Sequence, residues 1–335
     1  MKAIQLAFPG GLENLRLVDL PEPAAPGVGE ITVRLHASSL NYHDLLVVTR
    51  PRKADGALIP MADGAGVVTA IGADVTEFAP GDAVVSCFFP EWQTGRDMPG
   101  SFATVPGDGI DGFARESVTL PASAFTHAPK GYSHTEAATL TTAGLTAWRA
   151  LVVDGRIKAG DTVLVLGSGG VSILALQMAR SMGARVIATT SDAAKAERLR
   201  DLGADAVIDY VANPDWSVAV MEATAGRGVD IVIEVGGPAT LTQSIRSCRV
   251  GGHIALIGVL TGYSGEVATV ELMARQQKLQ GLIVGSREDQ RDMVRALEAF
   301  SWRPVIDRSL KLEEIAGAFA WQQAGRHFGK ICLTW

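Results

Sequence analysis

The sequence predicts an α/β protein in which a doubly wound parallel sheet is inserted into a second, β-rich domain. Its length of 335 residues suits two domains. The first third of the chain contains short apolar runs broken by glycine and proline, whereas the middle alternates apolar strands with amphipathic helices. Apolar residues make up 47% of the chain and charged residues 20%, which is enough material for two buried cores.

The N-terminal part of the chain is typical of short strands. Residues 31–37 alternate between apolar and polar side chains, as a half-buried strand does. Residues 64–72 and 81–86 are apolar runs that begin at glycine. Because long helical patterns are rare before about residue 123, we expect a β-rich domain of barrel type here.

The pattern changes after about residue 158. Continuous apolar strands separated by helices predict a parallel sheet that is buried on both faces. The expected strands are 162–166, 185–190, 206–210, 230–235, 253–257 and 282–284, with helices at 171–182 and 193–202. A helix at 312–323 and a strand at 330–335 are expected to return to the first domain. The predicted domains are therefore 1–122 plus 297–335, and 123–296.

Composition limits the class of partner. The net charge of −6 argues against nucleic acid or an anionic membrane, because both require a basic face. The N-terminus lacks the pattern of a signal peptide, and no apolar run predicts a membrane span. The cysteines Cys87, Cys248 and Cys332 are far apart in sequence. We expect a soluble, reduced, cytoplasmic protein that acts on a small molecule.

A glycine-rich loop follows the first strand of the parallel sheet and begins a helix, which is the context that a dinucleotide site requires. Glycine lets the backbone approach a pyrophosphate, and the helix N-terminus supplies N–H groups and a partial positive charge. Ser172 stands where the last glycine is expected, and it is small enough for close packing of helix on sheet. The predicted cofactor-binding residues of this loop are Gly167, Ser168, Gly169, Gly170 and Val171.

The end of the second strand predicts which cofactor is preferred. An NAD-specific site places Asp or Glu about 20 residues after the loop, to hold the ribose 2′-hydroxyl. Here the strand ends in Thr190 and Ser191, and Lys195 follows four residues later. An uncharged end and a nearby cation favour a 2′-phosphate. We therefore expect NADP(H), with NAD(H) possible, and we interpret Asp192 as a helix cap.

Several motifs resemble one family. Residues 39–44, 59–66, 137–148 and 160–210 are similar, in the same order, to the medium-chain dehydrogenase/reductase superfamily. The similarity covers the whole chain and is greatest to the zinc-free branch of quinone oxidoreductase-like and alcohol dehydrogenase-like members. It implies a Rossmann domain inserted into a GroES-like catalytic domain. It also implies a homodimer joined at the sheet edges, here through residues 282–285.

The same resemblance argues against zinc. The zinc-dependent branch binds catalytic zinc through Cys, His and Cys, and the corresponding positions hold Asn41, Ala62 and Thr142. Alanine has no donor atom, and amide and hydroxyl oxygens are poor zinc ligands. The structural zinc of that branch needs four cysteines in one loop, and residues 87–102 contain only one. We expect no bound metal.

The resemblance implies where the remaining site residues lie. Tyr42 and Asn41 are candidate hydrogen-bond donors to substrate, although each could equally be structural, and Thr142 is a further candidate at the reacting end. His43 could relay a proton, but beside Asp44 an ordinary surface pair is the more frequent alternative. Candidate cofactor contacts are Thr146, Tyr210, Val235, Gly258, Val259, Leu260, His327 and Lys330, the last two being equally compatible with a solvated basic cluster.

Chemistry without zinc favours substrates that accept hydride readily. A quinone or an α,β-unsaturated carbonyl places the negative charge on an oxygen that a hydrogen bond can stabilise. The leading prediction is therefore an NADPH-dependent reductase of such substrates. A zinc-free alcohol dehydrogenase and a non-catalytic nucleotide-binding protein are the alternatives.

Overall fold

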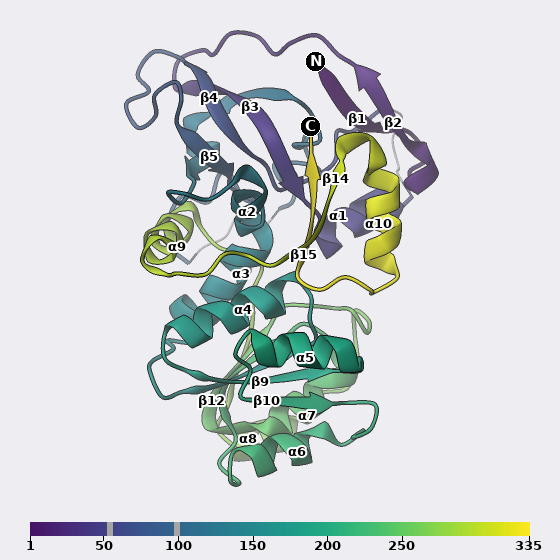
Figure 1. The fold of residues 1–335 in the computed structure, drawn as a ribbon, viewed down its shortest axis with the longest axis vertical. Helices are drawn as coiled ribbons and strands as arrows, with labels where there is room; N and C mark the ends of the chain where they lie inside the picture. The colour runs from purple at the N-terminus through teal and green to yellow at the C-terminus, as the bar shows by residue number, and fades with distance from the viewer. Residues whose placement is uncertain (52–55, 97–100) are drawn as a thin grey trace. The chain divides into compact units, whose positions relative to one another are not determined.

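The computed structural model describes residues 1–51, 56–96 and 101–335. Two compact units divide the chain between them (Figure 1). Unit 1 comprises residues 1–145 and 285–335, and unit 2 comprises residues 146–284. In the described part of the chain, no helix is long and apolar enough to cross a membrane.

Unit 1 is built around a seven-stranded, mainly antiparallel sheet with the order β14-β15-β3-β4-β5-β7, in which β6 also pairs with β3. A separate pair, β1 and β2, lies beside it. This confirms the β-rich domain. The strands are β1 (Lys2–Leu6), β2 (Leu15–Asp19), β3 (Glu30–Ser39), β4 (Ala65–Ile71), β5 (Ala83–Ser86), β6 (Ser117–Pro121), β7 (Phe125–His127), β14 (Ile306–Lys311) and β15 (Lys330–Thr334).

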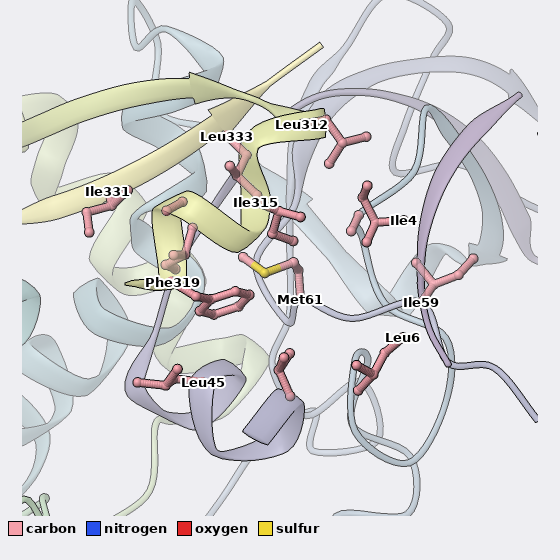
Figure 2. Packing of buried hydrophobic residues seen from close by; sticks show 14 of the residues in the cluster. Ile4, Leu6, Leu45, Ile59, Met61, Leu312, Ile315, Phe319, Ile331 and Leu333 are labelled. Atoms are coloured by element: carbon pink, nitrogen blue, oxygen red, sulfur yellow. The ribbon is translucent and has the colours of Figure 1, made fainter. Parts of the chain in front are cut away.

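The helices of unit 1 lie between and after its strands, and the C-terminal one packs against the start of the chain. They are α1 (Tyr42–Thr49), α2 (His134–Ala138), α9 (Arg287–Ala299) and α10 (Ile315–Gln323), with a π-helix, η3 (Leu140–Gly144). Figure 2 shows Ile315 and Phe319 of α10 in one buried cluster with Ile4 and Met61. The C-terminal segment therefore packs with the beginning of the chain in unit 1.

Unit 2 is a six-stranded parallel sheet with the order β10-β9-β8-β11-β12-β13. Its strands are β8 (Thr162–Leu166), β9 (Arg185–Thr190), β10 (Ala206–Asp209), β11 (Val229–Glu234), β12 (Cys248–Leu256) and β13 (Lys278–Gly281). Its helices are α4 (Gly170–Ser181), α5 (Ala193–Asp201), α6 (Trp216–Ala223), α7 (Pro238–Ser247) and α8 (Thr269–Ala274), after α3 (Leu145–Trp148) and the π-helix η4 (Arg149–Asp154).

This sheet has helices on both faces, as the continuous apolar strands predicted. Figure 1 shows α4 and α5 on one face and α6, α7 and α8 on the other. Every residue of β8 and of β11 is buried. The strand order reverses between these two neighbours, and in open α/β sheets the ligand binds at the carboxyl ends of the strands at such a reversal.

The boundaries of the two units differ from those predicted at residues 123 and 297. Unit 1 extends to residue 145 because α2 packs on β3, β4 and β5. It resumes at residue 285 because Arg287, at the start of α9, donates from Nε to the Phe125 carbonyl oxygen at 2.8 Å and from a guanidinium NH₂ to Glu77 at 2.7 Å. These contacts join segments far apart in sequence, so no local sequence pattern predicts them.

The last strand of the parallel sheet was placed wrongly. The apolar run 282–284 was expected to form it, whereas β13 is Lys278–Gly281. An edge strand pairs on one side only and need not be continuously apolar. The run that follows buries Leu282 and Val284, with Val284 at a φ of 48°, which is incompatible with a strand.

Candidate active site

The glycine-rich loop of unit 2 is built to receive a phosphate. Gly167 has a φ of 73°, and a Cβ added to Gly167 or Gly169 would meet nothing within 4 Å. Gly169 is the N-cap of α4 and offers no side chain to the first N–H groups of the helix. Ser172 is buried and donates to the Leu166 carbonyl oxygen at 2.6 Å, which ties α4 to the end of β8. These residues fit a dinucleotide pyrophosphate.

The end of β9 has no acidic side chain directed at a ribose. Asp192 caps α5, as expected, because its Oδ1 accepts from the Lys195 backbone N–H at 3.0 Å. Ser191 and Tyr210, which are 19 positions apart in sequence, are brought together, with the Tyr210 hydroxyl donating to Ser191 Oγ at 3.0 Å. Thr190 is buried at the strand end. The candidate contacts to the adenine ribose therefore converge at the ends of β9 and β10.

Two further turns meet at the carboxyl ends of β11 and β12. The Thr261 N–H donates to the Gly236 carbonyl oxygen at 2.8 Å. A Cβ on Gly258 would lie 1.9 Å from the Val235 carbonyl oxygen, so the turns are in direct backbone contact. Val259 and Leu260 continue the second turn, and Leu260 is 55% exposed. Only glycine permits this approach at position 258.

Sequence reasoning missed the residue that shapes these turns. Glu234 is fully buried at the end of β11. Its Oε1 accepts from the backbone N–H groups of Gly236 and Gly237 at 2.7 and 2.9 Å, and from Thr240 Oγ at 2.6 Å. Ser244 donates to the other oxygen. The signal was present as an acidic residue ending an otherwise apolar strand.

In unit 1, Asn41 is held by protein partners on every side. Its side-chain NH₂ donates to Asp44 Oδ2 at 3.0 Å and to the Ser39 carbonyl oxygen at 3.3 Å. Its Oδ1 accepts from Lys330 Nζ at 2.6 Å. The amide protons that were expected to reach substrate are therefore already used, and Asn41 positions its neighbours instead.

Asp63 is the centre of the same network, which we call the Asn41–Lys330 cluster (Ser39, Asn41, Asp44, Asp63, Thr142 and Lys330). Asp63 is fully buried and accepts from Ser39 Oγ at 2.5 Å and from Thr142 Oγ at 2.6 Å, with Lys330 Nζ 3.7 Å away. Thr142 lies in the π-helix η3, an element frequent at functional sites. Its hydroxyl proton is committed to Asp63, so only its oxygen lone pairs are available.

Lys330 does not occupy the position expected of a phosphate ligand. Its side chain is 3% exposed, and its ammonium donates to the Leu40 carbonyl oxygen at 2.7 Å as well as to Asn41. Two buried carboxylates, Asp44 and Asp63, share this one cation. Burial and the charge of Asp63 raise the pKa of Asp44. Lys330 therefore neutralises the buried cluster, whereas the sequence predicted either a phosphate contact or a solvated basic residue.

His43 is not paired with Asp44, the alternative considered from sequence. Its Nε2 lies 3.1 Å from Asp108 Oδ2, and Arg50 also bonds to Asp108. The ring packs edge-on to Phe88 and stacks on Phe102, at centroid distances of 5.3 and 5.6 Å. Asp108 is 65 residues away in sequence, so no spacing could have indicated this pair.

The remaining predicted residues lie in several elements. Tyr42 begins α1 and is 38% exposed, so it can present its hydroxyl to a ligand. Thr146 is buried in α3 of unit 2. His327 precedes β15 and belongs to unit 1.

The positions that would hold catalytic zinc do not fit the metal. Ala62 is buried and has no side-chain donor atom; its backbone N–H donates to Asp44 at 2.9 Å, and its carbonyl oxygen accepts from Ser86 Oγ at 3.2 Å. The Asn41 oxygen accepts from an ammonium, and the Thr142 hydroxyl donates to a carboxylate, so neither is a free ligand. Within residues 1–51, 56–96 and 101–335, no group of three or more His, Cys, Asp and Glu side chains could hold a metal ion.

Comparison with known proteins places the two units in one family. Residues 27–130 match the alcohol dehydrogenase GroES-like domain, and residues 170–299 match the zinc-binding dehydrogenase domain. A zinc-type alcohol dehydrogenase-like protein of Schizosaccharomyces pombe is 37% identical, over 96% of both chains. The match to both domains and the length of the alignment agree with the fold described above.

Solved structures agree over the whole chain. One described as an alcohol dehydrogenase from Sinorhizobium meliloti has a TM-score of 0.92 and 39% identity, covering 100% of this chain and 99% of the other. One described as an NAD-dependent alcohol dehydrogenase has a TM-score of 0.90 and 34% identity, covering 100% of both. A mycobacterial quinone oxidoreductase has a TM-score of 0.82 and 28% identity, covering 100% and 99%.

Proposed function

We propose a specific chemistry for this chain, which belongs to the medium-chain dehydrogenase/reductase superfamily and is an NAD(P)-dependent oxidoreductase. The proposed reaction is the zinc-independent, NADPH-dependent transfer of hydride to a quinone or an α,β-unsaturated carbonyl. The observation that carries it is the Asn41–Lys330 cluster. The atoms that stand where a zinc site would need ligands are already bonded to protein partners.

Without a metal, an oxyanion must be stabilised by hydrogen-bond donors. Asn41 and Thr142 have no donor proton to spare, whereas the Tyr42 hydroxyl is on an exposed side chain. We assign Tyr42 as the donor to the oxygen that becomes negative. Asn41 and Thr142 hold the local backbone and the buried charges in place. Nicotinamide, when bound, supplies the hydride.

Support for NADPH over NADH comes from the end of β9. Ser191 and Tyr210 place two hydroxyls at this end, and the Asp192 carboxylate is turned onto α5. A 2′-phosphate accepts hydrogen bonds from such hydroxyls, and Lys195 supplies a nearby cation. One similar solved structure is described as NAD-dependent, so the comparison of NADPH with NADH tests this preference directly.

Alcohol oxidation is the second candidate function. It is favoured by the S. pombe relative and by two of the solved structures, all three described as alcohol dehydrogenases or alcohol dehydrogenase-like. A zinc-free site lacks the Lewis acid that usually stabilises the alkoxide. This candidate therefore requires an activated alcohol. In it, the Tyr42 hydroxyl oxygen would accept a hydrogen bond from the substrate hydroxyl.

We also propose that the protein is a homodimer. In unit 2, β13 is an edge strand, and Ile283, which follows it, is 41% exposed. Val270 and Met273 of α8, the helix before β13, are 70% and 72% exposed. An exposed strand edge with apolar neighbours pairs readily with a second copy of itself. Sedimentation equilibrium would give the mass of one chain if this is wrong.

The reaction is tested by following the absorbance of reduced nicotinamide. NADPH and NADH are compared with a quinone, with a small enone and, using oxidised cofactor, with a secondary alcohol. We expect oxidation of NADPH by the quinone or the enone, with at least about tenfold higher kcat/KM for NADPH than for NADH. Turnover of the alcohol alone would replace the proposed reaction by the second candidate.

A further inference from the structure

The His43–Asp108 pair has the form of a proton-transfer dyad. Asp108 is held by two cations or cation-forming groups, His43 at 3.1 Å and Arg50. Its side chain is 9% exposed. Burial alone would raise the pKa of Asp108, but the hydrogen bonds from His43 and Arg50 and the charge of Arg50 lower it below its usual value. Asp108 is therefore a carboxylate, which can only accept.

An ionised Asp108 fixes the role of each ring nitrogen of His43. Nε2 must carry a hydrogen, because the carboxylate beside it has none to donate. The proton that comes and goes is consequently the one on Nδ1. Neutral His43 is a base at Nδ1, and protonated His43 is an acid there, which is the logic by which a carboxylate orients a catalytic imidazole.

Nδ1 itself is buried and has no hydrogen-bond partner among the described residues. A buried polar atom is almost always bonded, and an exception calls for an explanation such as a catalytic role. Phe88 and Phe102 pack against the ring and offer no polar atom in compensation. The carboxylate of Asp108 and the two aromatic rings hold the His43 ring in place. Its Nδ1 is therefore suited to bond a ligand.

We infer that His43 is the proton donor and acceptor of the reaction, and that Asp108 and Arg50 are its positioning residues. The inference rests on the proposed reduction. Hydride from NADPH forms a C–H bond on the substrate and moves an electron pair onto its oxygen. The Nδ1–H bond of protonated His43 breaks, and the proton neutralises that anion at carbon or oxygen. NADP⁺, the reduced substrate and neutral His43 remain, and water returns the proton to Nδ1.

The charged groups around the ring are consistent with this cycle. Asp108 and Arg50 form an ion pair on the Nε2 side. Asp44, the next residue in α1, is a second acidic group that interacts with His43, and its pKa is raised by burial and by Asp63. Because Asp108 keeps its negative charge, it can orient the His43 ring without taking the proton from it.

The test compares two substitutions. In His43→Gln, the amide NH₂ can still donate to Asp108, so the fold is kept while the proton is lost. Asp108→Asn would reverse the tautomer of His43, because its amide donates to Nε2. His127→Gln is the matched control, since His127 is exposed and its Nε2 lies against a backbone carbonyl, that of Glu77, rather than a carboxylate. Cofactor binding is measured for each by NADPH fluorescence.

We expect His43→Gln to lower kcat for the enone or quinone by about 10²–10⁴-fold, the range typical of a general acid. The limb of the kcat/KM profile that falls with rising pH should disappear, and NADPH affinity should stay within about twofold. Asp108→Asn should lose at least about tenfold in kcat and displace the same limb. In His43→Ala, added imidazole should restore part of the rate.

Each outcome decides one claim. If wild type reduces the enone or quinone, and His43→Gln keeps its kcat and its pH profile, the proton role of His43 is wrong and the proposed reaction stands. If wild type reduces neither substrate, the proposed reaction itself fails, and this inference falls with it. A loss of kcat in His43→Gln without any change in the pH profile would make His43 structural and would also overturn the inference.

Discussion

The cofactor turns of unit 2 and the Asn41–Lys330 cluster of unit 1 are both rich in chemistry, but they are encoded differently. The turns are local in sequence, and glycines at the end of a strand and at the start of a helix indicate them. The cluster joins residues from β3, α1, η3 and β15, and its bonded pair Asn41 and Lys330 is 289 positions apart. A glycine-rich turn can be predicted from neighbouring residues. The role of a buried charged residue depends on partners that only the folded structure brings into contact with it.

We expect the largest difference in stability between the two regions when the cation of the Asn41–Lys330 cluster is removed. Lys330→Met leaves Asp44 and Asp63 buried without a compensating charge, and breaking a buried ion pair in this way costs about 3–5 kcal/mol. Urea unfolding should show this loss, and the control Lys130→Met, at an exposed side chain, should not. An equally stable Lys330→Met protein would mean that the cluster is not held together by charge.

A second effect, in unit 2, depends on pH. His253 is 6% exposed, and neither ring nitrogen has a partner among the described residues. Burial, with Lys278 as the next contribution, lowers the pKa of His253 to about 4. In the unfolded chain the His253 imidazole is protonated below about pH 6.5, whereas in the folded chain it stays neutral down to about pH 4. The free energy of unfolding is therefore at its full value above pH 6.5 and decreases as the pH falls towards 4.

The loss should reach about 3 kcal/mol, since one pKa unit corresponds to about 1.4 kcal/mol. Urea unfolding between pH 7 and pH 4 measures it. His253→Leu should flatten the acid side of the profile, whereas His127→Leu, at an exposed imidazole, should leave the profile as in wild type. The same acid slope in His253→Leu and wild type would contradict the assignment.

The fold, the glycine-rich loop and the Asp192 helix cap could be predicted from the sequence because their signals are short-range. The strand pattern gave the parallel sheet, and the glycine loop and the Asp192 cap are where the sequence placed them. Asp108 and the partners of Lys330 were not predictable, because their contacts join segments far apart in sequence. Glu234 was missed although its partners are local and an acidic residue at the end of an apolar strand marks it. The edge strand β13 was missed because its single-sided pairing relaxes the apolar pattern.

A smaller effect tests the local half of the comparison. Gly167→Ala places a Cβ at a φ of 73°, in a turn where the space is open. The strain costs about 1 kcal/mol in stability. The Cβ should hinder a pyrophosphate and raise the Kd for NADPH at least about tenfold. Fluorescence titration measures this, with Gly317→Ala in α10, where a Cβ also meets nothing within 4 Å, as the control.

The smallest expected effect concerns the choice of cofactor. Ser191→Asp introduces a carboxylate where a 2′-phosphate is proposed to lie, and it offers an acceptor to a ribose 2′-hydroxyl. The ratio of kcat/KM for NADPH to that for NADH should fall about tenfold or more, with the stability unchanged within about 0.5 kcal/mol. An unchanged ratio would remove Ser191 from the cofactor site.

The central claim is that bonded protein groups, and not a metal ion, occupy the reacting end of the site. The direct measurement is the rate of NADPH oxidation by an enone or quinone, before and after prolonged exposure to a strong chelator, with the metal content determined in parallel. We expect the rate of NADPH oxidation to be the same before and after chelation, with less than one zinc ion per chain in the protein. A rate that is lost in chelator and restored by added zinc would contradict it.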